Sequence, residues 1–131
     1  MRKLKATYGR GKYRVEACYL ETGRGIVMCL VGGDRPHVGA LALAIPRPSL
    51  KDPSKLSSST SVLTLMGHKE DEIVKPVAEK LAKELNQPVV VVAGLHIDEA
   101  SEEDIKRLKR GSFKVAERVL RRLRGDLRDV T

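Results

Sequence analysis

The chain has 131 residues, with 25 Lys and Arg against 17 Asp and Glu, so its formal net charge is +8. Hydrophobic residues make up 41% and charged residues 32%, which excludes an intrinsically disordered chain and predicts one globular domain over residues 1–131. No unbroken apolar run is longer than residues 26–31, far below the roughly 20 residues of a membrane-spanning helix. Two cysteines and the lack of a signal-peptide pattern favour a cytoplasmic location.

Two groups of side chains are scarce. Asn86 and Gln87 are the only amides, while Lys, Arg and Glu are abundant, a composition typical of proteins from hot environments. Aromatic side chains are limited to three tyrosines and one phenylalanine. Recognition of single-stranded nucleic acid by stacked bases is therefore disfavoured.

A β-hairpin is predicted near the N-terminus. Residues 13–21 are rich in strand formers, residues 26–31 are continuously apolar, and Gly23 between them suits a type II′ turn. A two-residue loop places Cys18 opposite Cys29, and a pair of small, buried, reduced thiols is favoured there over a redox device. Residues 1–10, ahead of this hairpin, are expected to form a flexible basic arm.

Two further strands are predicted before the first helix. Residues 38–45 are apolar and predict a strand. It is expected to end at Pro46 and Pro48, because proline lacks the N–H that a sheet ladder needs. A polar connection then runs to Leu56, and a strand follows at residues 61–66. The serine-rich run 57–61 fits either a solvated loop and strand edge or a hydroxyl-lined anion site.

A helix, a strand and a second helix complete the chain. Apolar residues recur at helical spacing over 73–85, with the regular part beginning near Lys75 because of the proline at 76. Residues 88–95 read as a buried strand, which predicts a right-handed crossover that leaves this strand parallel to the strand at 61–66. Ser101 begins a capping box and hence the last helix, which Gly111 and Ser112 are expected to interrupt. Residues 125–131 are expected to fray.

Together these elements predict the α/β (α+β) class. The expected architecture is a single two-layer domain in which an N-terminal antiparallel β-meander precedes a β-α-β crossover and a C-terminal helix. About five strands and two helical segments are expected, in a protein that self-associates through an apolar sheet face or the last helix.

All three histidines lie where a predicted strand meets a loop, and each has an acid close by in sequence. If the strands at 61–66 and 88–95 are parallel neighbours, His68 and His96 lie beyond their carboxyl ends, where open α/β sheets bind ligands. The sequence neighbours are His37 with Asp34, His68 with Glu70 and Asp71, and His96 with Asp98.

Two kinds of site compete for these segments. An anion or phosphate site could be built from the Gly32-Gly33 backbone, the loop 67–69 at a helix N-terminus, and nearby hydroxyls. Three imidazoles with carboxylates behind them could instead form a zinc centre, although no His-x-x-x-His spacing supports it. The plainest alternative is that the histidines cap strands and bond their neighbouring acids.

The positive charge is concentrated at the two ends of the chain. Residues 1–14 hold six basic and no acidic side chains, and residues 102–131 hold ten basic against six acidic. Nucleic-acid binding is one interpretation. The basic residues of the last helix alternate with its apolar positions, however, which favours a solvated helix face, and no nucleic-acid-binding motif accompanies them.

Four segments, read in chain order, carry a family resemblance: residues 32–40, 59–61, 67–71 and 93–98. They resemble the successive blocks of the prenylated-flavin chaperone-like family, which includes the small D subunit of gallate- and vanillate-type decarboxylases. That family is similar in fold to proteasome-assembly chaperones, which are small α/β proteins that act as oligomers. The resemblance spans residues 11–108 and leaves the basic C-terminal region unexplained.

The resemblance implies a non-catalytic accessory protein or chaperone that helps a prenylated-flavin-dependent decarboxylase acquire or keep its modified flavin mononucleotide (FMN). The expected partners are that decarboxylase and further copies of the chain, with neither nucleic acid nor membrane. The alternatives are a metal-dependent hydrolase using the three histidines and a basic nucleic-acid-binding protein. The predicted cofactor-binding residues are Gly32, Gly33, Asp34, His37, Ser59, Thr60, Gly67, His68, Lys69, His96 and Asp98.

Overall fold

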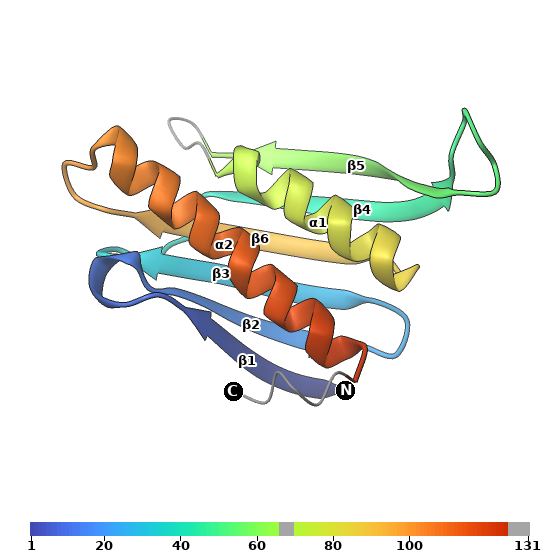
Figure 1. Ribbon diagram of the computed structural model, residues 1–131, viewed down its shortest axis with the longest axis horizontal. Helices are drawn as coiled ribbons and strands as arrows, with labels where there is room; N and C mark the ends of the chain where they lie inside the picture. Colours follow the sequence, from blue (N-terminus) through green and yellow to red (C-terminus); the bar gives the residue numbers. More distant parts are fainter. Residues whose placement is uncertain (66–69, 126–131) are drawn as a thin grey trace.

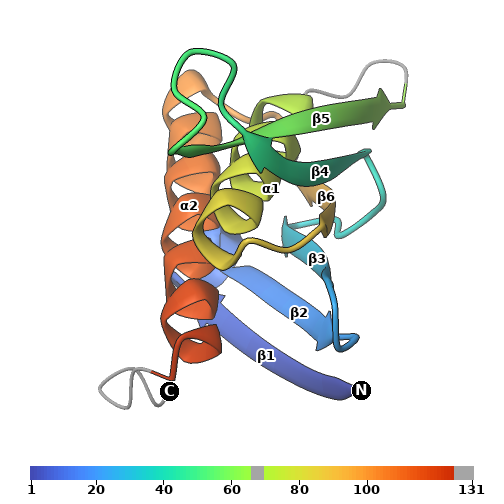
Figure 2. The same cartoon turned by 90° about the vertical axis from the view of Figure 1, so that its right-hand side faces the viewer.

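A single mixed sheet of six strands carries both helices on one of its faces (Figures 1 and 2). The computed structural model describes residues 1–65 and 70–125. A short 3-10 turn, η1 (Gly11–Tyr13), joins the first two strands. The strands and helices are β1 (Arg2–Tyr8), β2 (Val15–Glu21), β3 (Ile26–Gly33), β4 (Ala40–Pro48), β5 (Leu56–Thr64), α1 (Asp71–Leu85), β6 (Val89–His96) and α2 (Glu102–Leu123).

The strand order is β1-β2-β3-β6-β4-β5, so the last strand in sequence lies inside the sheet. It runs parallel to β3 and antiparallel to β4. The predicted α+β class is confirmed. Strand β5, before α1, runs parallel to β6, after it, as predicted, because both are antiparallel to β4; the two are not neighbours, because β4 lies between them. Four consecutive valines make β6 a strand that needs a neighbour on each side, whereas the serine-rich β5 tolerates the sheet edge.

The predicted β2–β3 hairpin is confirmed, including its register. Cys18 pairs with Cys29 across the two strands, and both cysteines are free thiols. The turn closes through the Thr22 N–H, which donates to the Gly25 carbonyl at 3.0 Å. Gly23 in this turn has φ +111°, a conformation that other residues rarely adopt.

Both cysteines are expected to titrate as free thiols when the protein is unfolded without reductant, and to react slowly in the native state. Burial, and to a lesser degree the neighbouring Cys18, raises the pKa of the Cys29 thiol, so less reactive thiolate is present at neutral pH. An Ellman titration of native and urea-unfolded protein measures this. A count of zero thiols after unfolding would show a disulfide and contradict the reduced pair.

Residues 2–8, expected as a flexible arm, form strand β1 along the full length of β2. Ala6 is buried on the helix-covered side, while Lys5 alternates with it and pairs with Glu16 at 3.3 Å. From α2, the Arg118 guanidinium donates to the Thr7 carbonyl at 2.6 Å. The sequence did not indicate this strand because its positive charge is typical of a solvated segment. With β1 the sheet has six strands, where about five were predicted.

Strands β4 and β5 are longer than predicted. Strand β4 continues through both prolines, because it pairs with β6 only over residues 40–44 and beyond that point has β5 as its one neighbour. Strand β5 begins at Leu56 and ends at Thr64, so the serine run belongs to the strand and not to a loop.

Both helices also exceed the prediction. Helix α1 begins at Asp71 and contains the proline at position 76, and α2 runs through Gly111 and Ser112 without a break. Ser112 is fully buried and its hydroxyl donates to the Leu108 carbonyl at 2.9 Å, which keeps it inside the helix. The predicted capping box of Ser101 is confirmed, with Asp104 as its partner. The fraying expected over residues 126–131 lies outside the described residues.

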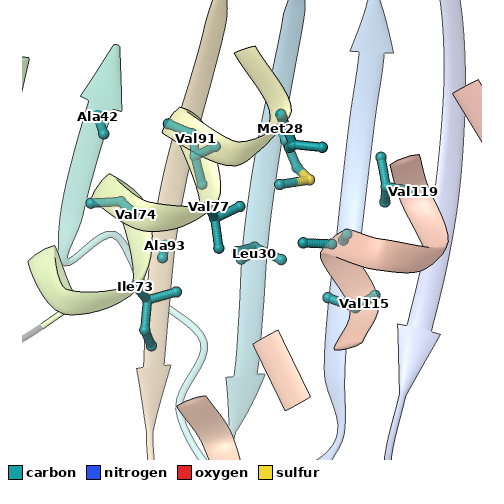
Figure 3. Close-up of a cluster of buried hydrophobic side chains, with 14 of the residues drawn as sticks. Met28, Leu30, Ala42, Ile73, Val74, Val77, Val91, Ala93, Val115 and Val119 are labelled. Atoms are coloured by element: carbon teal, nitrogen blue, oxygen red, sulfur yellow. The ribbon is translucent and has the colours of Figure 1, made fainter. Parts of the chain in front are cut away.

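The core lies between the sheet and the two helices, which share it (Figure 3). Met28 and Leu30 of β3 lie between the helices and are fully buried, with Val77 of α1 on one side and Val115 of α2 on the other. No helix among the described residues is long and apolar enough to cross a membrane.

Candidate functional site

The loop between β3 and β4 is tied to the carboxyl end of β6. The Asp34 N–H donates to the His96 carbonyl at 2.6 Å, and the His37 N–H donates to the Gly94 carbonyl at 3.4 Å. Gly33, the last residue of β3, lies beside His96 in the parallel register. The first and last of the predicted histidine segments therefore share one end of the sheet.

Two of the glycines here are required by close backbone approach. A Cβ atom on Gly94 would lie 1.5 Å from the His37 carbonyl oxygen, so any side chain would push the loop off β6. A Cβ atom on Gly39 would lie 2.5 Å from the Glu70 carboxyl carbon. These absent side chains let the loop and the N-terminus of α1 close over the end of β6.

His37 and Glu70 form the most enclosed polar contact of this region. The Nε2 atom of His37 lies 2.9 Å from Oε1 of Glu70, and the two side chains are 25% and 7% exposed. The Nδ1 atom of the same ring lies 2.9 Å from the Arg35 carbonyl oxygen. Each of the two ring nitrogens thus faces an oxygen atom.

The acid beside His37 is therefore not the one predicted from sequence. Asp34 instead accepts a hydrogen bond from the Asp98 N–H at 3.1 Å. Glu70, which the sequence placed with His68, reaches His37 because α1 begins beside the β3–β4 loop.

His96 approaches the first pair from β6. Its Nε2 atom lies 3.2 Å from Asp98, which also pairs with Arg35 at 3.0 Å. The His37 and His96 rings are 6.4 Å apart between centroids, in an edge-to-face arrangement at 78°. Two of the three histidine segments thus converge. Gly67, His68 and Lys69 lie outside the described residues.

Ser59 and Thr60 lie away from this cluster. Both belong to β5 and pair with residues 44 and 45 of β4, whereas the end of β4 nearest the histidines is residue 40. Four residues of strand correspond to about 13 Å. Ser59 accepts a hydrogen bond from Arg47 at 2.8 Å. The hydroxyl and histidine segments of the predicted site are therefore separated along the sheet.

A cavity of about 300 Å³ opens beside Glu70 and His96, between the end of β6 and the N-terminal parts of both helices. Its volume is at the lower end of the range for small-molecule sites. Lys109 and Glu72 also line it and form an ion pair at 3.9 Å. Its apolar wall comes from Ile73, Leu95, Ile97, Ala100, Ile105 and Leu108.

Sequence reasoning missed this cavity, because apolar residues at helical spacing, such as Ile105 and Leu108 of α2, are ordinarily read as core positions. Leu108 is buried, but Ile105 is 50% exposed and contributes to the cavity wall. The sequence did contain a signal. Ile105 is an apolar residue about one turn before Leu108, the first buried apolar residue of α2.

The histidines do not complete a metal centre within the described residues. Over residues 1–65 and 70–125, no group of three His, Cys, Asp or Glu side chains is arranged to hold a metal ion. What the arrangement offers is an apolar cavity with imidazole and carboxylate groups at one end, suited to holding a mostly apolar ligand by a few directed hydrogen bonds.

A family model described as the prenylated flavin chaperone LpdD-like domain matches residues 9–124. The chain belongs to this family. The match includes the β3–β4 loop, the start of α1 and the end of β6, and it extends into the basic part of α2 that the resemblance in sequence had left out.

Comparison with solved structures supports the fold. A chain from a chaperone complex for yeast 20S proteasome assembly superposes with a TM-score of 0.59 at 12% identity, covering 96% of this chain and 97% of that one. At this identity the likeness shows a shared fold, as the predicted similarity to proteasome-assembly chaperones implied. No curated protein matches the sequence.

Proposed function

We propose that the protein is a cytoplasmic, non-catalytic chaperone that binds prenylated FMN and transfers it to, or retains it for, a prenylated-flavin-dependent decarboxylase. Membership of the prenylated flavin chaperone family supports the class of function. The observation that carries the binding role is the apolar cavity of about 300 Å³ that ends at Glu70 and His96.

The cavity suits part of a modified flavin better than the whole molecule. Its aliphatic wall matches the apolar rings, and Glu70, which His37 holds at 2.9 Å, and His96 present polar atoms at one end. In this proposal the ribityl phosphate extends out of the cavity towards the Gly32-Gly33 backbone, which lies beside the end of β6. Asp34 and Asp98 are already engaged with one another and with Arg35, so they position the loop and do not contact the anion.

Isothermal titration of the full chain with FMN and with prenylated FMN tests this proposal. Wild type is expected to bind the prenylated form more tightly. Ile105→Asp, which places a charge on the half-exposed cavity wall, and His96→Ala are each expected to weaken binding about tenfold, equivalent to about 1.4 kcal/mol.

Lys83→Ala, an exposed change in the last turn of α1, is the matched control and should leave affinity unchanged. Absence of binding to both flavins by wild type would contradict the flavin role. A pull-down with the decarboxylase would then test docking alone.

We also propose that the chain functions as a homo-oligomer joined through the sheet face that the helices leave uncovered (Figure 2). Two rows of neighbouring side chains cross this face from β2 through β3, β6 and β4 to β5. Val27 is 40% exposed and Leu63, at the end of one row, is 69% exposed. The rows are Cys18, Cys29, Val92, Leu41 and Leu63, and Leu20, Val27, Val90, Leu43 and Ser61.

A second copy is the occupant that this face suits best. From β2 to β5 its two rows contain no charged side chain, and Lys5 and Lys3 of β1 continue them at one edge of the sheet. In a two-fold dimer the same patch of each copy meets the other, so the apolar rows of one copy would pack on those of the second. The two sheets would then lie about 10 Å apart, the usual spacing of stacked sheets.

A further inference from the structure

A second cavity, of about 320 Å³, lies where the β1–β2 connection meets α2. It shares no lining residue with the first cavity. Neither the predicted site nor the proposed flavin cavity accounts for it. Its wall holds three arginines and two tyrosines: Arg10, Arg107, Arg110, Tyr8 and Tyr13.

The backbone around this cavity is fixed by short-range contacts. Gly9 has φ +90°, and a Cβ atom there would lie 2.7 Å from the Tyr13 carbonyl oxygen, so the turn depends on glycine. The Tyr13 N–H donates to the Arg10 carbonyl at 3.1 Å, which closes the turn beneath the cavity. The position of Arg10 is therefore set by the fold and not by a free chain end.

The aromatic side chain of this turn places one of the arginines. The Tyr13 hydroxyl donates to Asp104 at 2.6 Å, and the Arg107 guanidinium carbon lies 3.7 Å from the Tyr13 ring centroid. Stacking of this kind orients the planar guanidinium while leaving its N–H edge available. Arg110, almost one turn further along α2, lines the same cavity.

Acidic side chains do not neutralise these arginines in the described part of the chain. Asp104 accepts hydrogen bonds from the Tyr13 hydroxyl and the Ser101 N–H, and these contacts hold its pKa below the usual value. Its ion pair is with Lys12, at 3.8 Å. Within residues 1–65 and 70–125, Arg10, Arg107 and Arg110 form no ion pair. Three like charges around one cavity are unfavourable until an anion joins them.

We propose that this cavity binds the phosphate group of a small organic phosphate. Guanidinium groups match phosphate oxygens through paired, charge-assisted hydrogen bonds, and three of them can surround a phosphate dianion. A concave site of this volume suits a small molecule, whereas an acidic protein segment is better met by a flat basic surface. The site is independent of the flavin cavity and does not rest on the proposed flavin role.

Isothermal titration of the full chain with inorganic phosphate and with phenyl phosphate, at low ionic strength, tests this proposal. Saturable binding of both is expected, and it should weaken as salt is raised. Arg107→Gln and Arg110→Gln are each expected to lower phosphate affinity about tenfold or more, because a hydrogen bond between charged groups contributes roughly 1.5–3 kcal/mol.

Arg24→Gln is the matched control, since it removes the same charge from the exposed β2–β3 turn. Circular dichroism of each variant checks that the fold is intact. Equal weakening by Arg24→Gln would show a non-specific charge effect and overturn the site, as would the absence of saturable phosphate binding by wild type. Binding of a ten-residue glutamate peptide in preference to phosphate would also overturn it, in favour of an acidic protein partner.

Discussion

Gly94→Ala is expected to lower the free energy of unfolding by about 3 kcal/mol or more. The added methyl group would lie 1.5 Å from the His37 carbonyl oxygen and 2.2 Å from its carbonyl carbon. Neither atom can move without displacing the β3–β4 loop, which the His37 N–H ties to the Gly94 carbonyl. Urea denaturation followed by circular dichroism measures the loss.

The same substitution is expected to weaken flavin binding in protein that remains folded, because the loop that it displaces carries His37. Gly125→Ala is the control. Unlike Gly94, this position has a positive φ, +78°, and an added Cβ atom there meets nothing within 4 Å. Gly125→Ala is expected to lower the free energy of unfolding by about 1 kcal/mol, because a left-handed backbone is unfavourable for alanine. Equal losses in the two variants would mean that the contact with His37 is not the cause.

Leu41→Asp is expected to reduce the mass of the protein in solution to that of one chain, 14.5 kDa. Leu41 lies near the middle of the uncovered sheet face, between Val92 of β6 and Leu63 of β5. A carboxylate enclosed between two such faces would lose its hydration without gaining a partner, which costs several kcal/mol. Size-exclusion chromatography with light scattering gives the mass directly.

Leu50→Asp makes the identical change in the β4–β5 loop, where the side chain is 88% exposed, and is expected to leave the assembly intact. Val27→Asp, on β3, provides a second disruption should Leu41→Asp fail to fold. A wild-type protein that is already monomeric, or an assembly that survives both changes, would exclude this face as the interface.

The hairpin and the helix caps could be predicted from sequence because they depend on neighbours in the chain. The pairing of Cys18 with Cys29 follows from the length of one turn, and the start of α2 follows from the reciprocal bonds of Ser101 and Asp104. Strand β1 depends on equally simple alternation. Its lysines and arginine, however, are typical of a solvated arm. The prediction followed this composition and not the alternation of the residues.

The candidate site could be predicted only in part. The sequence identified the His37 and His96 segments, and these do meet at one end of the sheet. It could not identify Glu70 as the partner of His37, because that contact depends on where α1 begins relative to the β3–β4 loop. The serines of β5 looked equivalent in sequence to the other segments, but the register of β4 and β5 places them farther along the sheet.

By itself, the sequence determined the class of fold, the register of the first hairpin, and the family to which the chain belongs. The tertiary structure decided the order of the strands, the partner of His37, and both cavities. The physical reason is that alternation and helical spacing specify which face of an element is buried, but not which element covers it. Strand β6 lies between β3 and β4 because its valines require two neighbours, and that choice brings His96 beside His37 and opens the apolar cavity.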